Sequence, residues 1–307
     1  MIIAILLSYQ KVATIIDDLR FPPPGNLIDV GGCQLHLYST GTGEPTVVLD
    51  AGLSGTSLGW SLVQQEASKF AQVCSYDRAG YAWSKEASSE RTSLCLAEEL
   101  HTLLHAANIP GPYVLVGHSF GGCNALLFAD LYPAEVLGII LVDSVHEKML
   151  QEFPNEPQSG IYKFIHHPYF QSLLSMLGYN RLKGPSAEIK HMFAPLPKEI
   201  RSMYFAQMNK SSYTKTVSKE MAALQESLSQ LDERKVHLQN KPLIVITAGQ
   251  FSSRNEELVW NGLQKKLLAK SYRAKQIVAS KSDHMINHYE PEIIVKAIQE
   301  MLNVDEK

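Results

Sequence analysis

One serine stands where the sequence predicts a nucleophile. Ser119 is the central residue of Gly117–Gly121 (Gly-His-Ser-Phe-Gly), which follows the apolar run Val114–Val116 and precedes a helix-like stretch. A serine on a sharp turn from a strand into a helix exposes its hydroxyl above the edge of a sheet. The glycines suit such a turn, because it strains the backbone and crowds the neighbouring strand and helix.

Two other residues compete for this role. Ser57 lies in Gly55–Gly59, which has the same Gly-x-Ser-x-Gly spacing, but a loop-like segment separates it from the preceding apolar run Val47–Leu49. Cys123 follows the serine turn, where its thiol would point into the packing face of a helix. The strand–turn–helix context therefore favours Ser119.

A serine hydroxyl needs a base, and a histidine suits that role because its pKa lies near neutral pH. His284 follows the last predicted strand and should lie on a loop at the carboxyl edge of the sheet. His288, four residues later, is the alternative base, or else a surface or lid contact. We expect His118, beside the serine, to support neighbouring loops.

The histidine in turn needs a carboxylate that fixes its tautomer and stabilises its cation. Asp143 directly follows the apolar run Gly138–Val142 and should emerge at the same edge. Glu256 and Glu257 are the alternatives, although they begin a predicted helix, where acidic side chains suit the helix dipole. Asp283 is adjacent to the histidine and poorly placed to reach its ring.

Negative charge on a substrate's carbonyl oxygen requires fixed N–H donors. We expect these to be the backbone N–H of Phe120, directly after the serine, and that of Leu53, on the loop after Thr46–Asp50. This chemistry needs no cofactor. No metal-ligand spacing is found among the eleven histidines, since His101 and His105 are four apart but lack the flanking Glu of a zinc motif.

The order of the predicted elements is that of an α/β fold. Short apolar runs alternate with helical stretches, and uninterrupted Val/Ile/Leu runs are typical of parallel strands covered on both faces. We therefore predict a doubly wound, mostly parallel, eight-stranded sheet with antiparallel strands at its start. The predicted strands are Leu27–Val30, Gln34–Tyr38, Thr46–Leu49, Gln72–Tyr76, Tyr113–Val116, Gly138–Val142, Leu243–Thr247 and Lys275–Ala279.

Residues 25–145 and 241–307 form the predicted core, and residues 146–240, which contain no strand-like run, form a predicted helical lid insertion. One helix of the insertion is predicted from apolar residues at spacings of four and three: Val217, Met221, Leu224, Leu228 and Leu231. We expect the aromatic residues of the insertion to form its own core and in part to line a substrate pocket. They are Tyr162, Phe164, Tyr169, Phe170, Tyr179, Phe193, Tyr204, Phe205 and Tyr213.

Residues 1–24 combine an apolar helix with a proline-rich linker. The run Met1–Leu7 is too short to span a bilayer, and no basic residue precedes it. We expect an amphipathic helix that makes peripheral contact with a membrane or lies on the protein body, with a truncated membrane anchor as the alternative. Both a cytoplasmic and a membrane-associated location are compatible with this segment.

The composition argues against some classes of function. A formal net charge of −3 and the lack of a polybasic cluster argue against nucleic-acid binding. The hydrophobic fraction of 45% and the charged fraction of 19% are ordinary for a soluble globular protein. The four cysteines have no Cys-x-x-Cys spacing. Function should therefore depend on a site for a small molecule.

These residues together resemble the α/β-hydrolase superfamily from about Pro22 to the end of the chain. The serine segment is similar to its nucleophile elbow, and His284 followed by Pro291 is similar to its histidine segment. A closer resemblance is to lidded bacterial-type hydrolases, many of which begin with a membrane-anchoring segment. It rests on Pro22–Gly25 (PPPG), Val47–Gly52 (VVLDAG), Tyr76–Gly80 (YDRAG) and Leu141–Ser144 (LVDS).

The chain departs from the superfamily pattern in three places. Asp50–Gly52 replaces a frequent His-Gly, Ala82 stands where a glycine is usual, and the usual acid after the seventh strand is missing. The resemblance therefore implies that Asp143, after the sixth strand, is the acid. It also implies a serine esterase or lipase-like hydrolase acting on a small ester-like substrate. The alternatives are a C–C hydrolase or lyase, and a non-catalytic small-molecule-binding protein.

Overall fold

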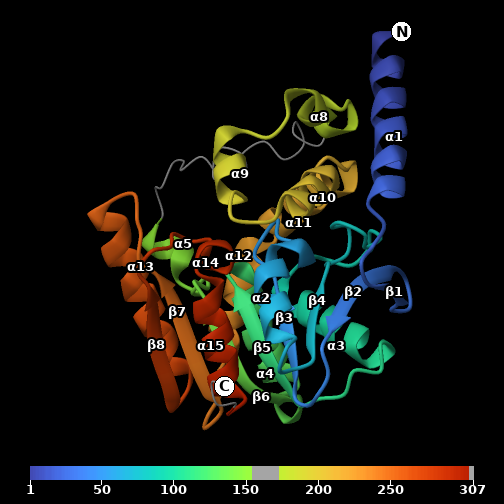
Figure 1. Ribbon diagram of the computed structural model, residues 1–307. Coiled ribbons are helices and arrows are strands. Elements are labelled where there is room, and N and C mark those ends of the chain that lie inside the picture. Colours follow the sequence, from blue (N-terminus) through green and yellow to red (C-terminus); the bar gives the residue numbers. More distant parts are fainter. Residues whose placement is uncertain (154–172, 304–307) are drawn as a thin grey trace.

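The computed structural model describes residues 1–153 and 173–303, and its centre is an eight-stranded sheet (Figure 1). The strand order is β1-β2-β4-β3-β5-β6-β7-β8. β2 runs antiparallel to β1 and β4, and all later pairs are parallel, which confirms the predicted mostly parallel sheet. The strands are β1 (Asn26–Asp29), β2 (Gln34–Thr40), β3 (Thr46–Asp50), β4 (Val73–Tyr76), β5 (Tyr113–His118), β6 (Val136–Val142), β7 (Pro242–Ala248) and β8 (Arg273–Ala279).

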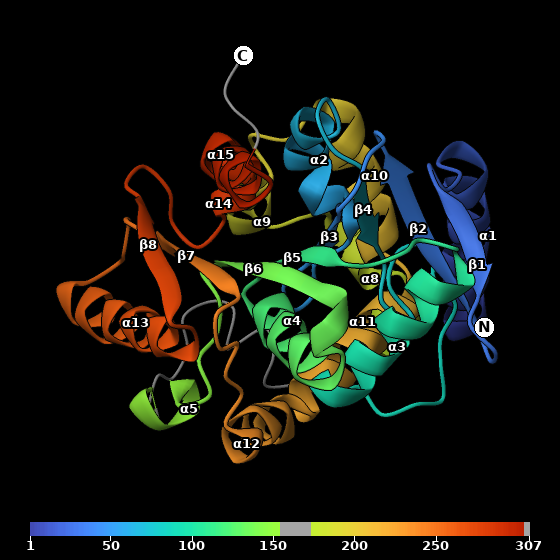
Figure 2. The same ribbon diagram turned by 90° about the horizontal axis from the view of Figure 1, so that it is seen from below.

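Helices cover both faces of this sheet, as the end-on view in Figure 2 shows. Every residue of β3 and β5 is buried, because apolar side chains on both faces of these strands pack under helices. One face carries α3 (Ser93–Ala106), α4 (Phe120–Leu131) and α13 (Arg254–Leu267). The other carries η1 (Ser57–Trp60), α2 (Ser61–Ala67), α14 (Ile286–Tyr289) and α15 (Pro291–Met301).

The described part of the segment between β6 and β7 consists of helices joined by turns and loops and contains no strand. Figure 1 shows α8–α11 gathered at one end of the sheet, whereas α12 returns to the side of α3 and α4. Tyr162, Phe164, Tyr169 and Phe170 lie outside the described residues. The helices are α5 (Met149–Glu152), α8 (Tyr179–Lys183), α9 (Ala187–Met192), α10 (Lys198–Met208), α11 (Ser211–Ala222) and α12 (Leu224–Arg234).

The single helix predicted around Val217–Leu231 is wrong, because the structure has two helices that meet at Ala223. Their apolar faces pack against different parts of the molecule. Val217 on α11 belongs to a small cluster with Tyr81, whereas Leu228 on α12 belongs to the main core under α3 and α4. The break at Ala223 allows α11 to pack against the cluster with Tyr81 and α12 to pack against the main core.

Aromatic residues of the insertion contact the loop that follows β3. The Tyr204 ring contacts the tilted ring of Phe193, with ring centroids 4.3 Å apart, and its hydroxyl accepts a hydrogen bond of 3.1 Å from the Thr56 N–H. The Tyr213 hydroxyl donates to the Ser54 carbonyl over 2.8 Å. These side chains therefore pack with one another and fix the loop at the same time.

A buried ion-pair network joins the insertion to the core. Arg78, on the loop after β4, donates from Nε and Nη2 to the two carboxylate oxygens of Glu220 on α11, over 2.8 and 3.0 Å. Its Nη1 also donates to Asp50 at the end of β3, over 2.9 Å. Arg78 is 2% exposed and Glu220 is fully buried, so each charge depends on the other for its stabilisation.

The predicted N-terminal helix is α1 (Ile2–Arg20), which extends away from the sheet in Figure 1. It is attached on the side of α8 and α10. Gln10 donates to the Asn209 carbonyl over 2.6 Å, Lys210 pairs with Asp18 over 2.8 Å, and Arg181 pairs with Asp17. Within the two described ranges, no helix combines the length and the apolar character needed to cross a membrane.

We predict that Glu220→Ala lowers the free energy of unfolding by about 3–5 kcal/mol, because it leaves the buried Arg78 without its bidentate partner. Glu226→Ala, at an exposed position of α12, is the control and should change this free energy by less than about 0.5 kcal/mol. Urea denaturation followed by circular dichroism measures both values. Equal losses in the two variants would contradict the role given to Glu220.

Candidate active site

Ser119 occupies a strained turn between β5 and α4. Its φ of 52° and ψ of −118° are unfavourable for a residue with a side chain, and its N–H donates to the Val142 carbonyl over 3.0 Å. The turn is also tight against the end of β3, since a Cβ added at Gly121 would lie 2.4 Å from the Asp50 carbonyl oxygen. The side chain of Ser119 is partly exposed, whereas its neighbours His118 and Phe120 are buried.

Asp143 and His284 meet at the same edge of the sheet. Asp143 follows β6 with a φ of 42°, and His284 lies on the loop between β8 and α14. Asp143 Oδ2 is 2.6 Å from His284 Nδ1, which makes Nδ1–H the donor to the carboxylate and leaves Nε2 as an acceptor. This is the tautomer that a general base requires.

The second oxygen of Asp143 is held by two further donors. Oδ1 accepts hydrogen bonds from the Ala248 N–H over 2.9 Å and from the Trp260 indole N–H over 2.8 Å. Asp143 is 2% exposed and therefore has little access to water. The two donors take the place of the water molecules that solvate an exposed carboxylate. Sequence reasoning missed Trp260, because nothing in its sequence neighbourhood shows that α13 brings this indole onto a residue 117 positions earlier.

The pKa of His284 is raised above its ordinary value. Burial by itself lowers this pKa, but the hydrogen bond to Asp143 and the negative charge of Asp143 outweigh it. The imidazolium form is therefore stabilised by the carboxylate beneath it. A histidine that collects a proton during a reaction benefits from this arrangement.

His118 fixes the position of His284 through the backbone. Its Nε2–H donates to the His284 carbonyl oxygen over 2.9 Å, and the two rings lie 4.7 Å apart. Burial, and then the charge of His284, lower the pKa of His118 well below its ordinary value, so that it stays neutral. The structure thus places His118 where it supports the histidine loop, as the sequence analysis expects.

The loop after β3 lies against Ser119. A Cβ added at Gly52 would be 3.1 Å from the Ser119 Cβ. Arg78 donates to the Ala51 and Gly52 carbonyls over 2.7 and 2.9 Å. The C=O and N–H of a trans peptide point in opposite directions, so the Leu53 N–H points away from Arg78.

The backbone N–H groups of Leu53 and Phe120 have no hydrogen-bond partner among the described residues. Phe120 is the first residue of α4, and the first N–H groups of a helix have no partner within that helix. These are the two donors that the sequence analysis predicts.

The other candidate nucleophiles lie in structural positions. Ser57 is 5% exposed in η1, and its N–H donates to Asp77 over 2.7 Å. Cys123 is buried in α4, its thiol contacts the Ser227 carbonyl, and burial raises the pKa of this thiol to about 12. A thiol with this pKa is protonated at neutral pH and is a poor nucleophile.

The alternative base and acids also have other partners. His288 Nδ1 donates to the Met192 carbonyl over 2.9 Å, and burial lowers the pKa of this buried histidine to about 4. His288 therefore connects α14 to the insertion through this hydrogen bond. Glu256 accepts from the Ser252 N–H, Glu257 pairs with Arg254, and Asp283 accepts from the Met285 N–H.

Comparisons with known proteins agree with this architecture. The family model described as alpha/beta hydrolase fold matches residues 45–305. The uncharacterized protein YqjL of Bacillus subtilis is 25% identical over 274 residues, which cover 89% of each chain.

Two solved structures are similar in fold. An esterase from Thermogutta terrifontis has a TM-score of 0.61 at 20% identity, covering 88% of this chain and 93% of its own. A laboratory-evolved variant of a potato epoxide hydrolase has a TM-score of 0.71 at 16% identity, covering 91% and 98%. At these identities the similarity concerns the fold alone.

We predict that Asp143→Asn lowers the pKa of His284 below its ordinary value. The substitution removes the charge that stabilises the imidazolium and leaves the opposing effect of burial. Titration of the ring protons by nuclear magnetic resonance measures the shift. Glu256→Gln is the control, because Glu256 raises this pKa only slightly. A larger decrease in the Glu256 variant than in the Asp143 variant would contradict the pairing.

Proposed function

The chain belongs to the alpha/beta hydrolase fold family, and from that premise we propose that it acts as a serine hydrolase on carboxylic esters or related acyl compounds. The observation that carries the proposal is the 2.6 Å hydrogen bond between Asp143 and His284, at the edge of the sheet where the strained turn presents Ser119. A nucleophile, a base and a carboxylate that orients the base are the parts that acyl transfer requires.

In the first half of the reaction, Ser119 Oγ attacks the carbonyl carbon of the ester and its proton passes to His284 Nε2. The C–O bond to the alcohol then breaks, and the alcohol leaves with the proton that His284 returns. In the second half, water gives a proton to His284 and attacks the acyl-enzyme. Collapse of that intermediate returns the proton to Ser119 and releases the carboxylic acid.

The site requires one adjustment for this reaction. Within the described residues, the Ser119 hydroxyl forms no hydrogen bond with His284. Catalytic hydrogen bonds are often long in ligand-free sites and shorten in the substrate complex. Rotation of the serine side chain toward Nε2 supplies the missing contact in our proposal.

The backbone N–H groups of Leu53 and Phe120 would stabilise the oxyanion in both tetrahedral intermediates. Their value in this role comes from being held in place before the substrate arrives. Arg78 holds the loop that carries Leu53, and the N-terminus of α4 holds Phe120. The positive end of the helix dipole adds a favourable field at the same point.

The identity of the nucleophile separates this proposal from epoxide opening, which is the activity named for several proteins of similar fold. That chemistry forms an alkyl-enzyme ester on a carboxylate, which water can then hydrolyse. A serine that attacked an epoxide carbon would form an ether, which the same site could not hydrolyse. The hydroxyl at position 119 therefore favours acyl substrates.

The insertion favours a neutral substrate. Its buried aromatic side chains, Phe193, Tyr204 and Tyr213, gather beside the loop of residues 53–56. Such side chains suit a neutral or apolar acyl or alcohol group. We therefore propose that the insertion acts as a lid over an apolar part of the substrate.

We also propose that α1 makes a peripheral contact with membrane lipid. Of its residues, only Gln10 is buried, whereas Ile2, Ile3, Ile5 and Val12 are each more than half exposed. A helix that presents isoleucine and valine side chains to water gains free energy when it enters the lipid interface. This contact would place the esterase near substrates that partition into membranes.

We predict that Ser119→Ala abolishes labelling by a fluorophosphonate probe and lowers ester turnover by about 10⁴-fold or more. His284→Ala and Asp143→Asn should reduce both strongly, because they remove or misorient the base. Ser57→Ala is the matched control, since Ser57 has the same motif spacing and should retain full labelling. Gel fluorescence and a chromogenic ester assay provide the measurements.

The result that would contradict this function is a folded native protein that neither reacts with the probe nor turns over any ester. Tight binding of small molecules without turnover would then support the binding-protein alternative. Hydrolysis of β-diketones or cleavage of cyanohydrins in preference to esters would support the C–C hydrolase or lyase alternative.

We predict that replacing Ile2, Ile3 and Ile5 together by Ser weakens binding to phosphatidylcholine vesicles by about 100-fold, because each isoleucine loses part of its transfer free energy. Val278→Ser removes a similarly exposed apolar side chain from β8 and is the control. Vesicle sedimentation measures the bound fraction. Unchanged binding after deletion of residues 1–20 would exclude a membrane role for α1.

A further inference from the structure

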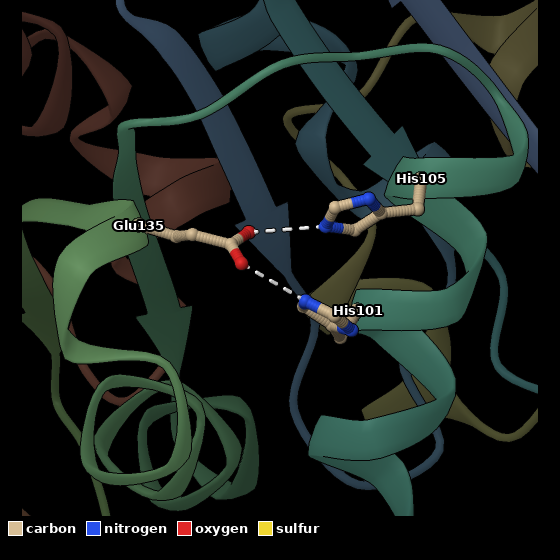
Figure 3. Close-up of side chains that lie close together, drawn as sticks. All are labelled: His101, His105 and Glu135. Atoms are coloured by element: carbon tan, nitrogen blue, oxygen red, sulfur yellow. Dashed lines mark hydrogen bonds and ion pairs between the residues drawn. The ribbon is translucent and has the colours of Figure 1, made fainter.

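A cluster of two histidines and one glutamate lies at the edge of the sheet opposite the candidate active site. His101 and His105 are on α3, and Glu135 ends the short helix η2 (Pro133–Glu135) that leads into β6. Figure 3 shows the carboxylate facing the two rings, with one oxygen toward each. His101 Nε2 is 3.0 Å from Oε1, and His105 Nε2 is 3.2 Å from Oε2.

The cluster is organised by its surroundings. His101 and His105 are four residues apart and therefore share one face of α3. The His101 ring stacks on Tyr132, with centroids 3.7 Å apart and planes within 7°, and it also contacts Phe128. Both histidines thus present Nε2 to the same carboxylate.

We propose that His101, His105 and Glu135 bind a divalent transition-metal ion of the Zn²⁺ type. Two imidazole nitrogens and a carboxylate oxygen are a ligand set that such ions prefer. One candidate ligand atom from each residue lies within 4.8 Å of the others. A tetrahedral ion with bonds of about 2.0–2.1 Å separates its ligands by roughly 3.3 Å, so small side-chain rotations suffice.

Metal binding requires a change of tautomer in both rings. Without an ion, the Nε2–H of each ring donates to a carboxylate oxygen of Glu135. When an ion binds, the proton of each neutral ring lies on Nδ1, so that both Nε2 lone pairs and the Glu135 carboxylate face the ion. The side chain of His105 is 58% exposed, which leaves an entry path and room for water as the fourth ligand.

The bound ion would act on stability. It would strengthen the connection between α3 and the turn between α4 and β6, which apolar packing and the two hydrogen bonds to Glu135 already join. An ion that binds only the folded protein raises its apparent stability in proportion to the logarithm of the free ion concentration. This inference is independent of the proposed ester hydrolysis.

The test is titration of the chelator-treated full-length chain with ZnCl₂, followed by calorimetry and by thermal unfolding. We expect one equivalent to bind and the Tm to rise by about 5 °C at 100 times the dissociation constant. MgCl₂ should leave the Tm unchanged, because Mg²⁺ prefers oxygen ligands.

Two variants assign the binding to the cluster. His105→Ala removes an exposed ligand without opening the core, and Glu135→Gln keeps the shape of the side chain but loses its charge. Each should weaken Zn²⁺ binding by about tenfold or more and, at the same Zn²⁺ concentration, reduce the rise in Tm to about half or less. His191→Ala removes an exposed histidine elsewhere and should leave both unchanged. Equal Zn²⁺ affinity in native protein and His105→Ala, or no Zn²⁺-dependent rise in Tm, would overturn the proposal.

Discussion

The arrangement of the site depends on the hydrogen bonds and ion pairs that the buried guanidinium of Arg78 makes. A charge with 2% exposure is tolerated only when its donors are satisfied, and Arg78 reaches two carboxylates and two backbone carbonyls. Burial lowers the pKa of Arg78, but Glu220 and then Asp50 raise it well above its ordinary value. The same side chain therefore fixes the insertion, the end of β3 and the peptide that carries Leu53.

Backbone hydrogen bonds compensate for strain at the carboxyl edge of the sheet. Ser119 and Asp143 both have positive φ, which is unfavourable for residues other than glycine. Each strained residue donates its N–H to the neighbouring strand: Ser119 to Val142 over 3.0 Å, and Asp143 to Ile246 over 2.7 Å. The parallel pairing of β5 with β6 and of β6 with β7 thus continues one residue beyond the end of β5 and of β6.

The sequence predicts those features that depend on local patterns. The eight strands follow from short apolar runs and, for the first two, from a hairpin signal at Gly31–Gly32. Ser119 and Asp143 follow from their positions directly after strands, and His284 from its position on the loop after the last strand. Contacts between distant segments escape this reasoning. Trp260 reaches Asp143 only because of how α13 packs, and the break at Ala223 arises because α11 and α12 have different packing partners. A spacing pattern contains neither kind of information.

The cluster of His101, His105 and Glu135 is also a contact between distant segments that the sequence alone does not predict, and it lies far from Ser119. The spacing of His101 and His105 is visible in the sequence, but Glu135 joins them only because α3 packs beside α4. α4 runs from Phe120 to Leu131, so about 18 Å of helix separates the Ser119 turn from this end of the fold. An ion bound there is too distant to polarise a carbonyl held at Ser119. It can influence that serine only through the stability of the helix whose first turn forms part of the site.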